Sequence, residues 1–201
     1  MSDSAQAPTR GSSLRSVWRD LQVDVATAVK YASDFSGDHL SPLRRLSVLL
    51  TPPLLCIAIY RLSHWCYCRG LLWPARFLSW TNFIIHRADI AHSAEIGPGL
   101  YVPHTVGVVF RGRAGSFLTL YFRSAVVGSR LDSRRDPQGP DCPCLGDHVT
   151  VGIFSLVKGP VHVGDRAFLG VGSVVLADLP ADVQVIGAKS AEWRPREGVV
   201  A

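Results

Sequence analysis

Hydrophobic residues follow two different periods along the chain. In the first part they recur every three or four positions, which places them on one face of a helix. The first such series is Leu14, Val17, Leu21, Val25 and Ala28. Ser41-Pro42 is typical of a helix start, and the chain is broken at Pro52-Pro53 and near Gly70. The sequence therefore predicts about four short helices in an α-helical domain of residues 14–86.

From residue 90 onward the period changes to six. The series runs through Ile90, Ile96, Val102, Val108, Ala114, Leu120 and Val126, and resumes at Leu145, Val151, Val157, Val163, Leu169 and Val175. Twelve of these thirteen positions are Ile, Leu or Val, and glycine often follows them. Neither a helix nor an ordinary strand has this period. Hexapeptide repeats are typical of a parallel β-helix with coils of about 18 residues, which we predict for residues 87–180.

The repeat is interrupted once, and the two ends of the chain lie outside it. Residues 129–144 are rich in proline, glycine and charge, and predict an excursion loop. Residues 1–13 are polar and expected to be disordered, whereas residues 181–201 form a C-terminal tail. The predicted fold class is therefore α+β, with helices followed by a β-helix.

Composition narrows the function classes. Hydrophobic residues make up 47% of the 201 residues and charged residues 18%, which excludes a largely disordered chain. The net charge is +5, but no basic stripe interleaved with aromatic residues supports nucleic-acid binding. Five cysteines, an odd number, argue against a disulfide framework and favour a reduced, cytoplasmic setting. Cys66-x-Cys68 and Cys142-x-Cys144 are too closely spaced for a zinc knuckle, so no metal is expected.

Two apolar segments leave two interpretations open. Residues 46–60 are too short for a membrane-spanning helix and contain two prolines, so no transmembrane segment is expected. Together with residues 71–85, they can lie on a membrane surface. We favour the other interpretation, in which they pack on each other or on a sister subunit.

The hexads, the helical first part and the string DIAHSAEIGPGLYVPHTVGVV resemble the serine O-acetyltransferases. The likeness covers about residues 20–190 and extends to the left-handed β-helix acyltransferase superfamily. The resemblance implies a left-handed coil, a homotrimer or a dimer of trimers, and a site between neighbouring subunits. It also implies transfer of an acetyl group from acetyl-CoA to a hydroxyl group. The family's C-terminal isoleucine is absent, so docking to a cysteine synthase is not expected.

The resemblance also assigns catalytic residues. His104, just before the Gly-Val-Val segment, matches the family's general base, and Asp89 matches the carboxylate that orients it. They are fifteen positions apart, close to one coil, so their side chains are expected to meet at one corner. The imidazole then removes the acceptor's proton while the carboxylate fixes the tautomer and stabilises the imidazolium.

The acceptor-binding residues of the family are replaced. Pro103 stands where the family has an aspartate, Arg111-Gly112-Arg113-Ala114 where it has Gly-Glu-Thr-Ala, and Asp141-Cys142-Pro143 where it has Arg-His-Pro. The candidate substrate-binding residues are Asp38, Arg111, Arg113, Asp141 and Cys142. The two arginines are either a new contact for an anionic acceptor or solvated corners of the coil. We therefore expect a serine derivative or specialised metabolite as the acceptor and not free L-serine.

The donor groove differs as well. The family's Ile-Gly-Ala-Gly runs are replaced by Val151-Gly152-Ile153-Phe154 and Leu169-Gly170-Val171-Gly172. The candidate cofactor-binding residues are Gly128, Gly152, Ile153, Gly170 and Val171. The larger side chains imply a shifted CoA, a carrier-protein acyl group in its place, or compensating backbone shifts.

Three functions follow in order of preference. The first is an acyl-CoA-dependent O-acetyltransferase with His104 as base. The second is a transferase whose acyl donor or acceptor is bound to a carrier protein. The third is a non-catalytic assembly subunit, which the replaced contacts permit. An Asp89–His104 hydrogen bond would favour an enzyme.

Overall fold

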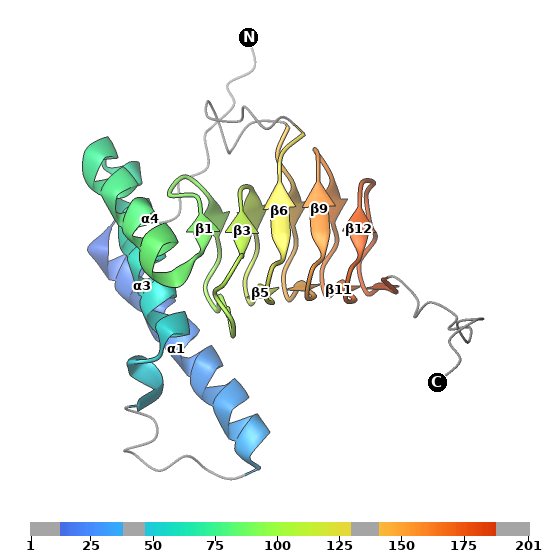
Figure 1. Ribbon diagram of the computed structural model, residues 1–201, viewed down its shortest axis with the longest axis horizontal. Helices are drawn as coiled ribbons and strands as arrows, with labels where there is room; N and C mark the ends of the chain where they lie inside the picture. The colour runs from blue at the N-terminus through green and yellow to red at the C-terminus, as the bar shows by residue number, and fades with distance from the viewer. Residues whose placement is uncertain (1–12, 38–46, 130–140, 188–201) are drawn as a thin grey trace, which may run out of the picture.

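The computed structural model describes residues 13–37, 47–129 and 141–187, and Figure 1 shows the helices packed beside one end of a stack of short strands. The helices are α1 (Leu14–Ser36), α3 (Pro52–Cys68) and α4 (Leu72–His86). The start of the helix predicted at Ser41-Pro42 lies outside the described residues, as do residues 1–12 and 188–201, whereas residues 47–49 are helical. Within the described ranges, no helix combines the length and the apolar character needed to cross a bilayer.

Local sequence sets the ends of the helices. The Ser13 hydroxyl accepts the backbone N–H of Ser16, and the Ser16 side chain accepts the backbone N–H of Ser13, which together cap α1. α1 ends at Gly37, whose φ of +69° is left-handed and therefore favours glycine. Pro52 and Pro53 occupy the first turn of α3, where a missing N–H costs nothing. The predicted break at these prolines is thus the start of a helix.

The rest of the described chain forms short parallel strands. They are β1 (Asp89–Ile90), β2 (Glu95–Ile96), β3 (Val109–Phe110), β4 (Arg113–Ala114), β5 (Thr119–Leu120), β6 (Ala125–Val127), β7 (Cys144–Leu145), β8 (Thr150–Val151), β9 (Leu156–Lys158), β10 (His162–Val163), β11 (Phe168–Leu169), β12 (Val174–Val175) and β13 (Gln184–Val185). Sheet A has the order β1-β3-β6-β9-β12, sheet B has β10-β7-β4-β2, and sheet C has β13-β11-β8-β5. Because the chain visits the sheets in turn, they are the three sides of a parallel β-helix.

Most coils repeat at the predicted interval. Glu95 pairs with Arg113 and Thr150 with Phe168, 18 positions apart in each case. Arg113 pairs with Cys144, 31 positions later, so the segment between them contains the predicted excursion. β13 pairs with β11, so the coil continues beyond residue 180, where the sequence placed its end.

One coil departs from this interval in sheet A. Asp89 pairs with Val109, 20 positions later, and Val109 pairs with Ala125, 16 positions later. The corner before β3 is therefore two residues longer than the regular one, and the corner after it is shorter by the same amount. A shift of two residues leaves the same side chains facing inward. As a result Phe110, rather than Val108 alone, fills this level of the core, and both are fully buried.

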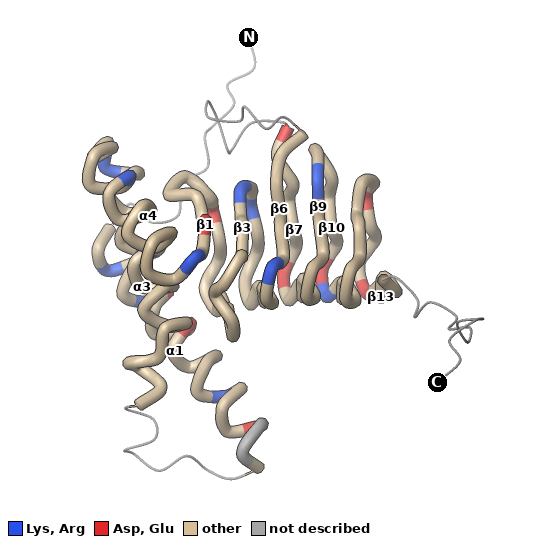
Figure 2. The backbone as a smooth tube through the Cα atoms, in the orientation of Figure 1, with Lys and Arg blue, Asp and Glu red and all other residues tan. Residues whose placement is uncertain are grey.

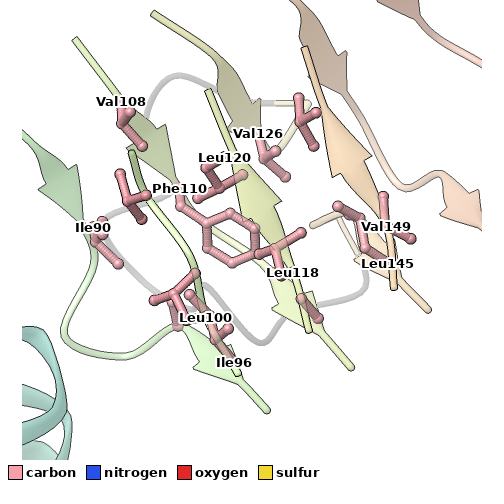
Figure 3. Packing of buried hydrophobic residues seen from close by; sticks show 14 of the residues in the cluster. Ile90, Ile96, Leu100, Val108, Phe110, Leu118, Leu120, Val126, Leu145 and Val149 are labelled. Carbon is pink, nitrogen blue, oxygen red and sulfur yellow. The ribbon is translucent and has the colours of Figure 1, made fainter. Parts of the chain in front are cut away.

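The core consists of the aliphatic residues of the six-residue series. All thirteen positions of that series are buried, with exposed fractions of at most 7%. Figure 3 shows members of this cluster stacked inside the coil, with the Phe110 ring between aliphatic neighbours. Each buried aliphatic side chain contributes roughly 1.5–3 kcal/mol, so this stack is the main source of the coil's stability.

A buried ion pair joins the helices to the first coil. The Asp24 carboxylate of α1 accepts hydrogen bonds from Nε and Nη2 of Arg61 in α3, at 2.9 and 3.0 Å. It also accepts the backbone N–H groups of Gly99 and Leu100, at 2.7 and 2.8 Å. Arg61 in turn donates to the carbonyl oxygens of Ile96 and Gly97, at 2.6 and 2.7 Å. Two helices and one corner of the coil are thereby fastened at a single point.

Solvent is excluded from this pair, since the Asp24 and Arg61 side chains are 0% and 4% exposed. Burial raises the pKa of the Asp24 carboxyl, while Arg61 and the two backbone N–H groups oppose that rise. With four hydrogen bonds to the carboxylate, the geometry is that of an ionised pair with satisfied partners.

We predict that Asp24→Asn lowers the free energy of unfolding by about 3–5 kcal/mol, because it leaves the buried Arg61 without a counter-charge. Urea unfolding followed by circular dichroism measures the change. The matched control is Asp182→Asn, which removes an exposed partner of Arg166 and is expected to change little. Equal effects of the two substitutions would contradict the prediction.

Candidate functional site

His104 lies in the long corner between sheet C and sheet A. Its side chain is exposed. The backbone of this corner rests on the chain segment at Asp89, since the N–H of Gly107 donates to the oxygen of Arg87 at 2.9 Å and that of Asp89 to Val108 at 2.8 Å. The structure therefore brings the two predicted catalytic residues to the same corner.

Asp89 is not hydrogen-bonded to His104 in this chain. Nη2 of Arg111 donates to Oδ2 of Asp89 at 2.8 Å, and both side chains are about one-third exposed, at 34% and 37%. Among the described residues, none forms a hydrogen bond with the His104 side chain. The expected Asp89–His104 hydrogen bond is thus replaced by an ion pair, because a permanently charged guanidinium lies within reach of the carboxylate.

A second histidine lies beside this ion pair. His92 is half-buried, and burial, followed by the charges of Arg76, Arg111 and His64, lowers its pKa, while Asp89 opposes the decrease. Nδ1 of the buried His64 lies 2.9 Å from the backbone oxygen of His92, which ties α3 to the first coil. The surroundings of Asp89 are thus crowded with cationic groups.

The remaining acceptor candidates line the edge between sheets A and B, called here the AB edge (residues 111–113, 128–129 and 141–143). The N–H of Arg113 donates to the oxygen of Pro143 at 3.0 Å, and that of Ser129 to Asp141 at 3.1 Å. A Cβ on Gly128 would lie 3.3 Å from Sγ of Cys142. Gly128, a predicted donor residue, therefore lies among the acceptor candidates. Asp38 lies outside the described residues.

The other donor candidates line the edge between sheets C and A, called here the CA edge (residues 103–107, 121–124, 152–155 and 170–173). The N–H of Gly172 donates to the oxygen of Ile153 at 2.8 Å, so successive corners are stacked. Val171 is 61% exposed and Ile153 is half-buried. The CA edge therefore carries His104 at one end and the predicted donor residues at the other.

The glycines of this edge are required by the coil itself. A Cβ on Gly152 would lie 2.4 Å from the backbone oxygen of Leu169, and one on Gly170 would lie 2.8 Å from that of Val185. Neighbouring backbone leaves no room for a side chain at either position. Stacking of the coils explains both glycines without a ligand.

Two aromatic rings and an arginine on the CA edge, called here the aromatic shelf (Phe122, Arg123 and Phe154), were not predicted as part of the site. The rings of Phe122 and Phe154 meet edge to face with centroids 5.7 Å apart, and the Arg123 guanidinium lies 5.3 and 5.6 Å from them. A cation held over aromatic rings can bind an anionic or planar group. The pair is hidden in the sequence because the excursion lies between its members and separates them by 32 positions.

A hollow of about 420 Å³ lies elsewhere, between α1 and the edge joining sheets B and C. Its polar lining includes Lys30, Asp34 and His148. None of the predicted site residues within the described ranges lines it. In the part of the chain that the structure describes, no group of three His, Cys, Asp or Glu side chains is placed to hold a metal ion.

The sequence of the chain is similar to proteins of one family. The chain is 34% identical over 145 residues to a serine acetyltransferase of Helicobacter pylori. The matched residues make up 71% of this chain and 82% of that protein. It is 32% identical over 145 residues to a serine acetyltransferase of Synechococcus elongatus and spans 57% of that relative's length. No family model matches the chain.

Solved structures agree on the fold. The serine acetyltransferase of Neisseria gonorrhoeae superposes with a TM-score of 0.73 at 24% identity, covering 90% of this chain and 65% of that one. Serine acetyltransferase 1 of Entamoeba histolytica, in complex with L-cysteine, gives a TM-score of 0.71 at 23% identity. That match covers 86% of this chain and 64% of the other.

We predict that Gly152→Ala lowers the free energy of unfolding by about 1–3 kcal/mol, because the new methyl group pushes two coils apart. Thermal unfolding without any ligand measures the effect. Val171→Ala, on the exposed side of the same edge, is the control and should change it by less than about 0.5 kcal/mol. If Gly152→Ala folds as stably as the unmodified chain but loses CoA binding, the glycine serves the ligand instead.

Proposed function

The chain belongs to the serine acetyltransferase family, and on this basis we propose that it transfers the acetyl group of acetyl-CoA to a hydroxyl group of a small acceptor. The observation that carries the proposal is the position of His104, exposed in a lengthened corner against the backbone of Asp89. Superposition on the solved relatives over 86–90% of the chain supports the same, left-handed, winding of the coil, since a coil of opposite hand would not superpose.

His104 acts as the general base. Its imidazole takes the proton of the acceptor hydroxyl while the oxygen attacks the thioester carbonyl. The tetrahedral intermediate collapses with loss of CoA thiolate, to which the imidazolium returns the proton. Asp89 stabilises the imidazolium when its carboxylate is turned toward that corner. Nothing in these steps requires a metal or a bound cofactor beyond acetyl-CoA as substrate.

The donor lies along the CA edge. Ile153 and Val171 stand where a thin pantetheine arm needs small side chains, so we place the arm beside these residues instead of over them. The shelf of Phe122, Arg123 and Phe154 supports this shifted path, because it offers a cation and aromatic rings on the same edge as His104. A carrier-protein acyl group is the alternative donor.

The acceptor is a compound other than free L-serine. A zwitterion needs an anion for its ammonium group and a cation for its carboxylate. Pro103 and Gly112 offer no carboxylate at the family's positions, and Asp141-Cys142 stand where the family has cations. Arg111 and Arg113 supply positive charge at a different place, which supports an acceptor with another distribution of charge.

The active molecule is a homotrimer. α4 buries only Ala75, Asn82 and His86, whereas Trp73, Phe77 and Trp80 are 82%, 63% and 60% exposed. Apolar side chains also lie exposed along the coil, at Val171, Val174 and Leu176. Contact with sister chains covers these surfaces and brings the CA edge of one chain near the AB edge of the next. A trimer thereby adds the AB-edge candidates of a neighbouring chain to the contact that Arg111 makes with Asp89 inside one chain.

The test of the catalytic proposal is His104→Ala, which should reduce the rate of acetyl transfer by about 10²–10⁴-fold through loss of the general base. Thiol release from acetyl-CoA measures the rate, with a panel of acceptors that includes L-serine, serine derivatives and simple sugars. His162→Gln, an exposed histidine in β10, is the matched control and should retain activity.

Full activity of a folded His104→Ala variant would rule out the proposed base. Efficient acetylation of L-serine would overturn the acceptor part alone. Absence of transfer to every hydroxyl by the unmodified protein would favour the assembly subunit, for which the Asp89–Arg111 pair in place of the dyad speaks.

If the protein is a trimer, we expect light scattering after size exclusion to give a mass of about three times the 21.9 kDa of the chain. Replacing Phe77 and Trp80 together by Glu should yield monomers, because charges cannot be buried in an apolar contact. Arg166→Glu, on a remote edge, should leave the trimer intact. A monomer that binds lipid vesicles would instead support the membrane-surface alternative.

A further inference from the structure

Within the described residues, the Arg111 side chain makes a single hydrogen bond. One Nη donates to Asp89 at 2.8 Å, and the other N–H groups of the guanidinium make no hydrogen bond within the described residues. A guanidinium has five N–H donors in a planar fork that fits a carboxylate or a phosphate with two parallel bonds. Since the side chain is 34% exposed, this fork is open to a ligand.

The surroundings of Arg111 favour an anion. Arg76 of α4 and Arg111 both act on His92, which lies next to them. No aspartate or glutamate occurs between residues 39 and 88, and Figure 2 accordingly shows basic but no acidic positions along α3 and α4. The acidic side chains on the facing coil are Asp89, which Arg111 already holds, and Glu95 of β2. Arg76 and Arg111 together place two positive charges near His92, and the carboxylate of Asp89 pairs with only one of them.

The ion pair with Arg111 also fixes the orientation of the Asp89 carboxylate. The backbone of Asp89 lies at the corner of His104, where its carboxylate would orient the base, but Arg111 holds that carboxylate in an ion pair. An incoming anion that takes the fork of Arg111 with two bonds competes directly with this single-oxygen contact. The carboxylate of Asp89 is then released next to the corner that carries His104.

We propose that Arg111 is a specificity-determining residue that binds an anionic group of the acceptor and thereby frees Asp89 to orient His104. The inference rests on the proposed acetyl transfer. It names the acceptor class as a hydroxyl compound with a carboxylate or phosphate near the reacting oxygen. It also makes the Asp89–His104 pair complete only when such an acceptor is bound.

Matched acceptors test the specificity. Glycerate and glycerol 3-phosphate are compared with their neutral counterparts, 2,3-dihydroxypropanamide and glycerol, by thiol release from acetyl-CoA. The unmodified protein should prefer one anion over its neutral partner by at least about tenfold in kcat/KM. The carboxylate and phosphate arms show which group is recognised. Arg111→Gln should abolish the preference, Arg111→Lys should keep part of it, and Arg166→Gln should keep all of it.

Imidazole ¹⁵N chemical shifts of His104 test the release of Asp89 without any turnover. Adding the preferred anion alone should shift the His104 signals of the unmodified protein toward those of a carboxylate-bound imidazole. In Arg111→Gln, the signals should already lie near that position and should not respond to the anion. In Arg166→Gln, they should behave as in the unmodified protein.

The outcomes separate the two proposals. Anion binding and His104 shifts that depend on Arg111, without transfer to any acceptor, would uphold the role of Arg111 and refute the acetyltransferase. Transfer with equal kcat/KM for charged and neutral acceptors would uphold the enzyme and refute the role of Arg111. An Arg111→Gln effect confined to KM for acetyl-CoA would assign this arginine to the donor and likewise overturn the inference.

Discussion

The position of the corner that carries His104 depends on the buried pair of Asp24 and Arg61. Through six hydrogen bonds, these two side chains fasten α1 and α3 to the corner formed by Ile96–Leu100. A buried ion pair adds little net stability over an apolar pair of the same shape, because desolvation offsets the attraction. Its effect here is one of placement: only one arrangement of helices and coil satisfies every donor and acceptor. α4, which packs on α3 and continues into β1, is held in turn, and with it Asp89.

The six-residue series was sufficient to predict the coil. Every position of this series, from Ile90 to Val175, is buried as expected, because inward-facing residues of a narrow coil have no alternative environment. The helices followed from periodicity, whereas their ends at Ser13, Pro52 and Gly37, which local geometry sets, had not been assigned. The two-residue shift at β3 was not predicted, because it preserves which side chains face inward and so leaves no trace in the hydrophobic pattern.

The site was predictable only in part, for a related reason. His104 and Asp89 reach the same corner because fifteen residues nearly complete one coil. Their relationship is decided by Arg111, whose reach across the sheet depends on side-chain conformation and not on spacing. The buried partner of Asp24 could not be read from a separation of 37 positions, and the excursion loop concealed the contact of Phe122 with Phe154. Contacts between distant segments thus could not be predicted from the sequence, whereas the buried positions of the repeat could.

The register shift in sheet A has a consequence for how such proteins diversify. One corner lengthened by two residues and the next shortened by two leave every other level of the core in place. Length can therefore pass from one corner to its neighbour without a change in the hydrophobic interior. A β-helix of this kind can remodel a corner such as the one that carries His104, and exchange the side chains around it, while the scaffold stays constant. The surroundings of this corner can therefore change by a few substitutions at a time, and each intermediate variant still folds because its core is unchanged.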